Sequence, residues 1–145
     1  MTPSEIPPSE IPFGFEPHFR KSPLTEPWEP LYSKRLADRV MIGLRTGQPH
    51  TNSRGLIHGG LIAALADNAM GLSCVQVLMA EGRKPEGGLV TVSMSTDFIG
   101  SAKLGQWVAF DTQYVKTGRT LCFAQAFVTA DSEVIARADA RFRVL

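Results

Sequence analysis

The chain has only two cysteines and almost no excess of charge of either sign. Its 145 residues carry 15 basic and 14 acidic side chains, which leaves a net charge of +1. No basic patch is interleaved with aromatic residues, so a nucleic-acid partner is not expected. Cys74 and Cys122 lie in apolar stretches and lack the spacing of a metal site or a redox pair. We expect both to be buried, reduced thiols in a cytoplasmic protein.

Several other signals are absent. Neither a glycine-rich phosphate loop nor a cluster of metal ligands occurs, so nucleotide hydrolysis, metal catalysis and a bound cofactor are not expected. The N-terminus carries prolines and glutamates where a signal peptide needs an apolar core. The apolar segment 56–80 is almost long enough to cross a membrane. Asp67, Asn68 and Gln76 interrupt it, and it has no aromatic belt or basic flank, so we expect no membrane partner.

Segment 56–80 instead predicts a buried helix from about Gly59 to Ala80, because its apolar residues fall on every side of the helical wheel. Gly82 and Pro85 follow and end it. A buried carboxylate is unfavourable unless hydrogen bonds hold it, because burial disfavours the charged form. Asp67 is therefore either a hydrogen-bonded structural group or a participant in chemistry.

The rest of the chain divides at residue 35. Residues 1–34 form a proline-rich N-terminal arm, whose aromatic side chains we expect to dock on the domain; these are Phe13, Phe15, Phe19 and Trp28. Residues 35–145 form one α+β domain, with a first strand within 35–46. Alternating runs at 89–99, 107–116, 121–130 and 134–144 predict an antiparallel meander. Such a sheet cannot enclose the long helix on all sides, so we expect at least a dimer.

One motif carries a resemblance to a known family. It reads Asn52-x5-His58-Gly59-Gly60-x6-Asp67, followed by Thr91 on the next strand and by the segments 101–105 and 116–120. With the order of elements over residues 35–145, it resembles the hotdog-fold acyl-CoA thioesterases, in their phenylacetate-pathway branch. The resemblance implies a long central helix wrapped by an antiparallel sheet of about five or six strands. It also implies acyl-CoA hydrolysis, coenzyme A only as part of the substrate, and a homodimer or dimer of dimers.

The chemistry of thioester hydrolysis suits these residues. A helix N-terminus offers unpaired N–H groups, and glycine lets a carbonyl oxygen approach closely. We expect the Gly59 N–H to stabilise the oxyanion, a contact typically worth about 3–4 kcal/mol. Asp67 is nine helical residues from His58, about 13 Å of rise, so it cannot reach that oxyanion in its own chain. The resemblance implies that it acts from the opposing subunit, as general base or nucleophile.

The remaining site residues are open to two readings each. Asn52 holds water or the carbonyl, or merely shapes its turn; His58 orients the thioester, or merely bonds its own loop. Thr91 stands where relatives carry a serine that positions the attacking water. Substrate-binding candidates are Gly60, Asn68, Arg83, Lys84, Lys116 and Arg119, the last four of them for phosphates.

Two histidines lie outside the motif. His18 and His50 have no partners nearby in sequence, so we expect both at the surface. Two other functions on the same fold stay open: a non-catalytic acyl-CoA-binding module, and a hydratase or dehydratase.

Overall fold

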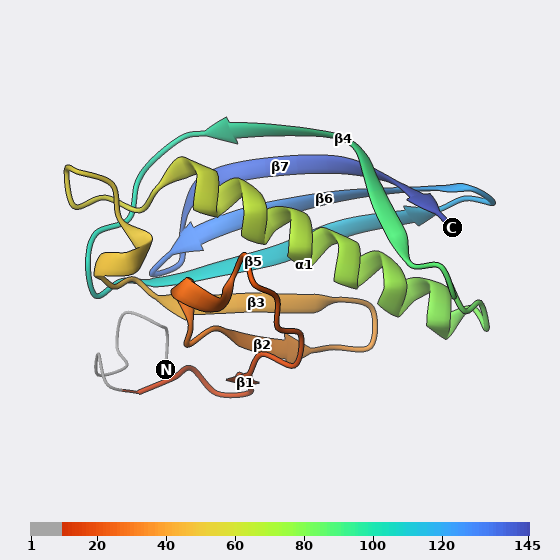
Figure 1. Cartoon of the computed structure of the whole chain (residues 1–145), viewed down its shortest axis with the longest axis horizontal. Coiled ribbons are helices and arrows are strands. Elements are labelled where there is room, and N and C mark those ends of the chain that lie inside the picture. Colours follow the sequence, from red (N-terminus) through yellow and green to blue (C-terminus); the bar gives the residue numbers. More distant parts are fainter. Residues whose placement is uncertain (1–9) are drawn as a thin grey trace.

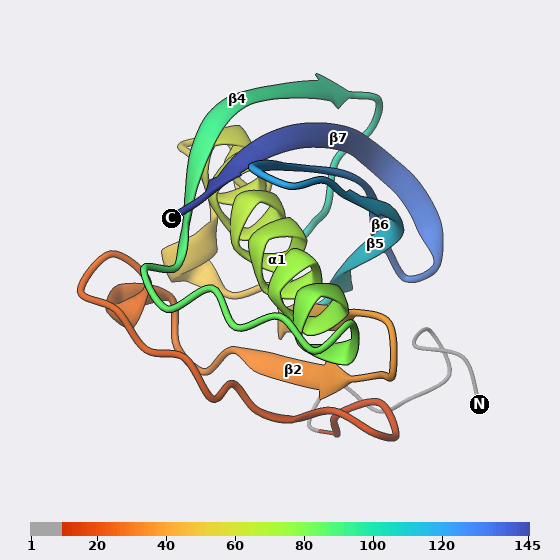
Figure 2. The same ribbon diagram turned by 90° about the vertical axis from the view of Figure 1, so that its right-hand side faces the viewer.

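A single long helix, α1 (Gly59–Ala80), lies across a seven-stranded antiparallel sheet in the computed structural model, which describes residues 10–145 (Figure 1). The sheet curves around the helix when viewed along it (Figure 2). Its strand order is β1-β2-β3-β5-β6-β7-β4. The bounds are β1 (Glu16–Pro17), β2 (Tyr32–Arg35), β3 (Val40–Arg45), β4 (Leu89–Phe98), β5 (Trp107–Thr117), β6 (Leu121–Ala130) and β7 (Glu133–Val144). Two short 3-10 helices, η2 (Glu26–Trp28) and η3 (Gln48–His50), interrupt the N-terminal third.

The helix has the predicted bounds. It begins at Gly59, where His58 caps it, and ends at Ala80, one residue before Glu81. Gly82 follows with a φ of +79°, a conformation that glycine adopts without strain. The helix α1 is long and apolar enough to cross a membrane, yet half of its most apolar stretch is buried inside the domain. Packing inside the domain accounts for its apolar composition.

The core lies between α1 and the inner face of the sheet. β7 alternates as predicted, with Ala136, Ala138, Ala140 and Phe142 buried. The small side chains of the three alanines leave room for larger ones of the helix, such as Leu65 and Met70, which are fully buried. Cys74 and Cys122 are buried and free, as expected.

The sheet has one or two strands more than expected, because the N-terminal arm contributes β1 and β2. The predicted boundary between residues 34 and 35 falls inside β2. Phe15 packs edge-on against Trp107, with ring centroids 5.1 Å apart, and Trp28 packs on the core. The prediction that Phe13 docks on the domain was wrong, because its side chain is 95% exposed. Phe19 is only partly covered and stacks under the Arg35 guanidinium.

One side of the domain stays uncovered. A stripe of α1 is only half-buried, and it consists of Ala63, Ala64, Asp67, Asn68, Gly71, Leu72, Val75 and Gln76. The adjacent edge strand, β4, is paired only with β7 and exposes Val90, Val92 and Phe98, each about half accessible. Apolar residues along an unpaired strand edge are typical of a surface that another chain covers.

The contact between β3 and β5 generates a stability prediction. Gly43 is buried, and a Cβ atom on it would lie 2.3 Å from Cζ2 of Trp107 and 3.0 Å from Phe15. We expect Gly43→Ala to lower the free energy of unfolding by about 1–3 kcal/mol, because the indole must shift. Gly47→Ala is the matched control, since its nearest neighbour would be 3.7 Å away. Urea denaturation of both variants measures the difference; equal stability would contradict the assigned packing.

Candidate active site

The His-Gly-Gly turn forms the start of α1. The Gly60 N–H donates to Nδ1 of His58 at 2.8 Å, so the proton of the neutral imidazole lies on Nε2. A Cβ atom on Gly60 would approach that ring to 3.0 Å, which explains the glycine. Within residues 10–145, no acceptor is bonded to the Gly59 N–H. This N–H is therefore available at the positive end of the helix.

Phe98 covers this turn. Its ring carbons lie 3.4 Å from the position that a Cβ atom on Gly59 would take. Phe98 is the last residue of β4 and is 54% exposed. The end of the edge strand therefore lies against the start of α1.

Asn52 shapes the loop before the helix. Its Oδ1 accepts hydrogen bonds from the backbone N–H groups of Arg54 at 2.9 Å and Leu56 at 3.2 Å. This is the turn chemistry of asparagine. No acceptor for its amide nitrogen lies in the described part of the chain, so the NH₂ group can serve a ligand.

Asp67 lies on the half-buried stripe of α1 beside the first half of β4. The Thr91 hydroxyl donates to its Oδ1 at 2.6 Å, and Oδ2 has no partner among the described residues. The structure thus brings Asp67 and Thr91 together. Gly59 lies eight helical residues away, about 12 Å of rise, so Asp67 and the Gly59 N–H are far apart within one chain.

A cavity of about 420 Å³ opens beside Asp67. The stripe of α1 and the start of β4 form two of its sides. The N-terminal arm forms the third side, to which it contributes His18, Arg20, Ser22 and Thr25. The cavity has the size of a small-molecule site. Asn68, one of the predicted substrate-binding residues, also lines it.

The prediction that His18 and His50 lie at the surface was wrong: both are buried, His18 within the arm and His50 against Trp28 of the arm. Each has only 4% of its surface exposed. The Nδ1 of His50 accepts from the Gly47 N–H at 2.9 Å, so its Nε2 donates to the Trp28 carbonyl at 2.7 Å. The Nδ1 of His18 is buried and has no partner among the described residues.

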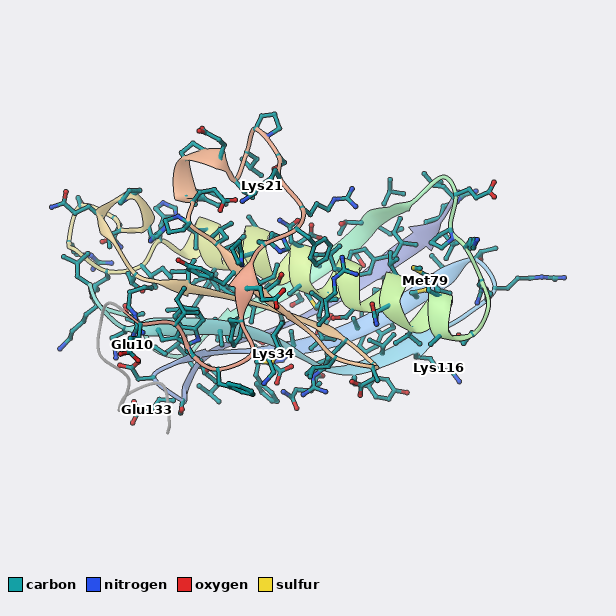
Figure 3. All side chains as sticks on the ribbon, turned by 90° about the horizontal axis from the view of Figure 1, so that it is seen from below. Glu10, Lys21, Lys34, Met79, Lys116 and Glu133 are labelled. Carbon is teal, nitrogen blue, oxygen red and sulfur yellow. The ribbon has the colours of Figure 1, made fainter. Side chains whose placement is uncertain are left out.

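Three of the four predicted phosphate-binding cations, Arg83, Lys116 and Arg119, lie at the other end of α1. Arg83 donates to the carbonyls of Gly118 at 2.9 Å and Arg119 at 3.1 Å, which ties it to the β5–β6 hairpin. Lys116 is exposed on β5, at the same end of the molecule as Met79 in the last turn of the helix (Figure 3). Arg119 is exposed as well. The Glu81 carboxylate lies at this end too, where it accepts a hydrogen bond from the Thr117 hydroxyl.

The helix-wrapping sheet and the His-Gly-Gly turn define a class of protein, the hotdog-fold enzymes that hydrolyse thioesters. The sequence profile of the thioesterase superfamily matches residues 54–136, and the chain belongs to that superfamily. A protein of Pseudomonas aeruginosa that carries the provisional name of esterase is 35% identical over 92% of this chain and 97% of its own length. Human acyl-coenzyme A thioesterase 13 is 33% identical over 63% of this chain and 61% of its own length.

Solved structures have the same fold. A mutant of the phenylacetic acid degradation protein PaaI of Thermus thermophilus superimposes with a TM-score of 0.72 at 22% identity, over 86% of this chain and 100% of that chain. A Streptococcus mutans protein bound to acetyl CoA gives a TM-score of 0.65 at 26% identity, over 74% of this chain and 82% of that chain.

The buried His18 generates a prediction about pH. Burial lowers its pKa below the ordinary value; Glu29 opposes this, and the nearby cations Arg20, Lys21 and Arg35 reinforce it. A histidine with a lowered pKa binds fewer protons when folded than when unfolded, so stability is lost as pH falls below about 6.5. The expected slope is at most about 1.4 kcal/mol per pH unit.

We expect His18→Leu to remove this part of the pH dependence. Urea midpoints of both proteins between pH 8 and pH 5 measure it. Carboxylates with lowered pKa, such as Asp139, destabilise both proteins alike at acid pH, so the difference between the curves isolates His18. Parallel curves would show that His18 does not titrate differently in the folded protein.

Proposed function

We propose that the protein hydrolyses acyl-CoA thioesters to the free acid and CoA, by an attack of water that Asp67 assists. The proposal rests most on the carboxylate of Asp67, held by Thr91 at 2.6 Å on the wall of a cavity of about 420 Å³. The names of the human relative and of the acetyl-CoA-bound Streptococcus mutans structure support CoA esters as the substrate class.

The reaction uses the two carboxylate oxygens differently. Thr91 bonds Oδ1 and orients the group, which leaves Oδ2 to accept a proton from water. The water oxygen then bonds to the thioester carbonyl carbon, whose oxygen becomes an oxyanion. When this intermediate collapses, the carbon–sulfur bond breaks and the sulfur leaves as the CoA thiolate, which takes up the proton that Asp67 accepted from water.

The turn at the helix start supplies the positive counterpart. The unpaired Gly59 N–H donates to the oxyanion. Because glycine has no side chain, the thioester carbonyl can approach this N–H closely. The Nε2–H of His58 and the side-chain NH₂ of Asn52 are two further hydrogen-bond donors. Each can serve the carbonyl, the water or the leaving sulfur. Gly60 serves indirectly, because its N–H fixes the His58 ring.

Two chains are needed to complete the site. Thr91, near the start of β4, holds Asp67, whereas Phe98, at its end, covers Gly59. Antiparallel pairing of two β4 edges about a twofold axis places the start of one strand beside the end of the other. Each Asp67 then meets the partner's Gly59. The dimer also covers the apolar edge of β4 and the open stripe of α1.

We assign the phosphates of CoA to Arg83, Lys116 and Arg119. Guanidinium and ammonium groups are the usual partners of phosphates. Arg83 keeps free N–H groups after its two bonds to the hairpin, and the other two side chains reach into solvent.

Asp67→Asn tests the catalytic assignment. We expect kcat to fall by about 10²- to 10⁴-fold on a panel of acyl-CoA esters, because the amide cannot accept the proton of the water. Release of free thiol is the readout. Thr91→Ser, which keeps the hydroxyl, is the control and should retain most of the rate. If Asp67→Asn hydrolyses the esters within a fewfold of the wild-type rate, the catalytic role of Asp67 is refuted. If the wild-type protein binds the esters saturably but does not hydrolyse them, a non-catalytic binding module is favoured.

Mixing two inactive variants tests the shared site. Asp67→Asn loses the base and Gly59→Val blocks the oxyanion position, but a mixed dimer retains one complete site. Random reassociation should therefore restore about a quarter of wild-type activity, since half of the dimers are mixed and each has one intact site of two. Activity is measured after co-refolding equal amounts. A mixture as inactive as its components would show that both groups act within one chain.

A further inference from the structure

We infer that the N-terminal arm builds the acyl-selecting wall of the cavity, and that His18 with Arg20 binds an acyl group that carries an oxygen remote from the thioester. The inference rests on the proposed hydrolysis of acyl-CoA esters and adds the class of acyl group. The oxygen can belong to a hydroxyl or to a carboxylate, because both accept hydrogen bonds.

The arm is held firmly enough to act as a wall. The backbone N–H of His18 donates to the Leu31 carbonyl at 2.9 Å. The Leu31 N–H in turn donates to the Glu29 carboxylate at 2.7 Å, and His50 donates to the Trp28 carbonyl at 2.7 Å. Trp28 itself packs on the core. The arm therefore presents His18 to the cavity from a fixed position.

The cavity has two unlike walls. Leu72, Val75, Leu89 and Phe142 make one side apolar. On the arm, the hydroxyls of Ser22 and Thr25 bond to each other at 3.1 Å and are already satisfied. His18 and Arg20 also line the cavity, and neither side chain has a hydrogen-bond partner among the described residues: the His18 ring is buried with its Nδ1 unsatisfied, whereas Arg20 is exposed.

An acyl group that reacts at Asp67 must occupy the space between these walls. A plain alkyl chain suits the apolar side but covers the arm without offering it any hydrogen bond. Polar groups left unpaired and desolvated are unfavourable, whereas an oxygen on the chain accepts from them. The positive charge of Arg20 favours the same oxygen. Discrimination between acyl groups therefore depends on the arm, separately from the groups that act on the thioester.

The experiment compares three CoA esters of equal chain length: hexanoyl-CoA, 6-hydroxyhexanoyl-CoA and adipoyl-CoA. We expect wild-type kcat/KM to be about tenfold higher for at least one oxygenated ester than for hexanoyl-CoA, the discrimination that one hydrogen bond supplies. His18→Leu should bring that ratio close to one. Preference for the hydroxyl or for the carboxylate distinguishes the two sources of the oxygen, and Arg20→Met should reduce mainly a preference for adipoyl-CoA.

Two further variants separate recognition from folding. Leu24→Ala is the matched control, because Leu24 lies on the same arm, is 65% exposed and does not line the cavity. It should leave the ratio unchanged. His18→Gln retains a side-chain N–H and should keep part of the preference. Thermal unfolding of each variant establishes that it is folded.

A wild-type ratio below about two for both oxygenated esters, or a preference that survives His18→Leu, would overturn the inference. Its failure is distinct from that of the proposed function. If no ester is hydrolysed, calorimetry with the thioethers S-hexyl-CoA and S-(6-hydroxyhexyl)-CoA still measures binding selectivity. Tighter binding of the hydroxylated thioether, lost in His18→Leu, would support the inference. Equal binding of the two thioethers overturns it.

Discussion

The arrangement of the molecule depends on how α1 is buried. The helix is apolar on all sides, but a sheet covers only one side of it, and the small alanines of β7 let that side approach closely. The opposite stripe stays half-covered, and Asp67 lies within it. This one-sided burial explains why Asp67 lies beside an open cavity. It also explains why a stripe of α1 is left without a covering surface.

Local patterns predicted the elements whose determinants lie in their own sequence. The bounds of α1 and of β6 agree with expectation, because periodicity and glycine punctuation decide them. β1 and β2 were not predicted. β1 contains Pro17 and is two residues long, so its identity as a strand depends on its pairing with Ser33 and Tyr32 rather than on its composition.

The environments of single side chains were the hardest to foresee. His50 looked unpartnered because its partner is distant in sequence: it bonds Trp28, 22 residues away. His18 looked exposed because the packing that buries it cannot be read from its neighbours in the chain. For Asn52 and His58, by contrast, the two alternative roles turn out to be compatible. One polar atom of each shapes the loop or caps the helix, and the other stays available. The sequence alone posed these as alternatives because it does not show which atom is used.

His50 also connects the two parts of the site. Its ring donates to the arm at Trp28, and its backbone carbonyl accepts from the His58 N–H at 2.9 Å, next to Gly59. The arm that lines the cavity and the turn that offers the Gly59 N–H are therefore fixed to a single buried residue. Two hydrogen bonds of the buried His50 thus join the arm to the residue that caps α1. In the proposed dimer, the arm of one chain borders the cavity at its own Asp67 while the turn serves the partner's carboxylate, so His50 links the two sites across the subunit.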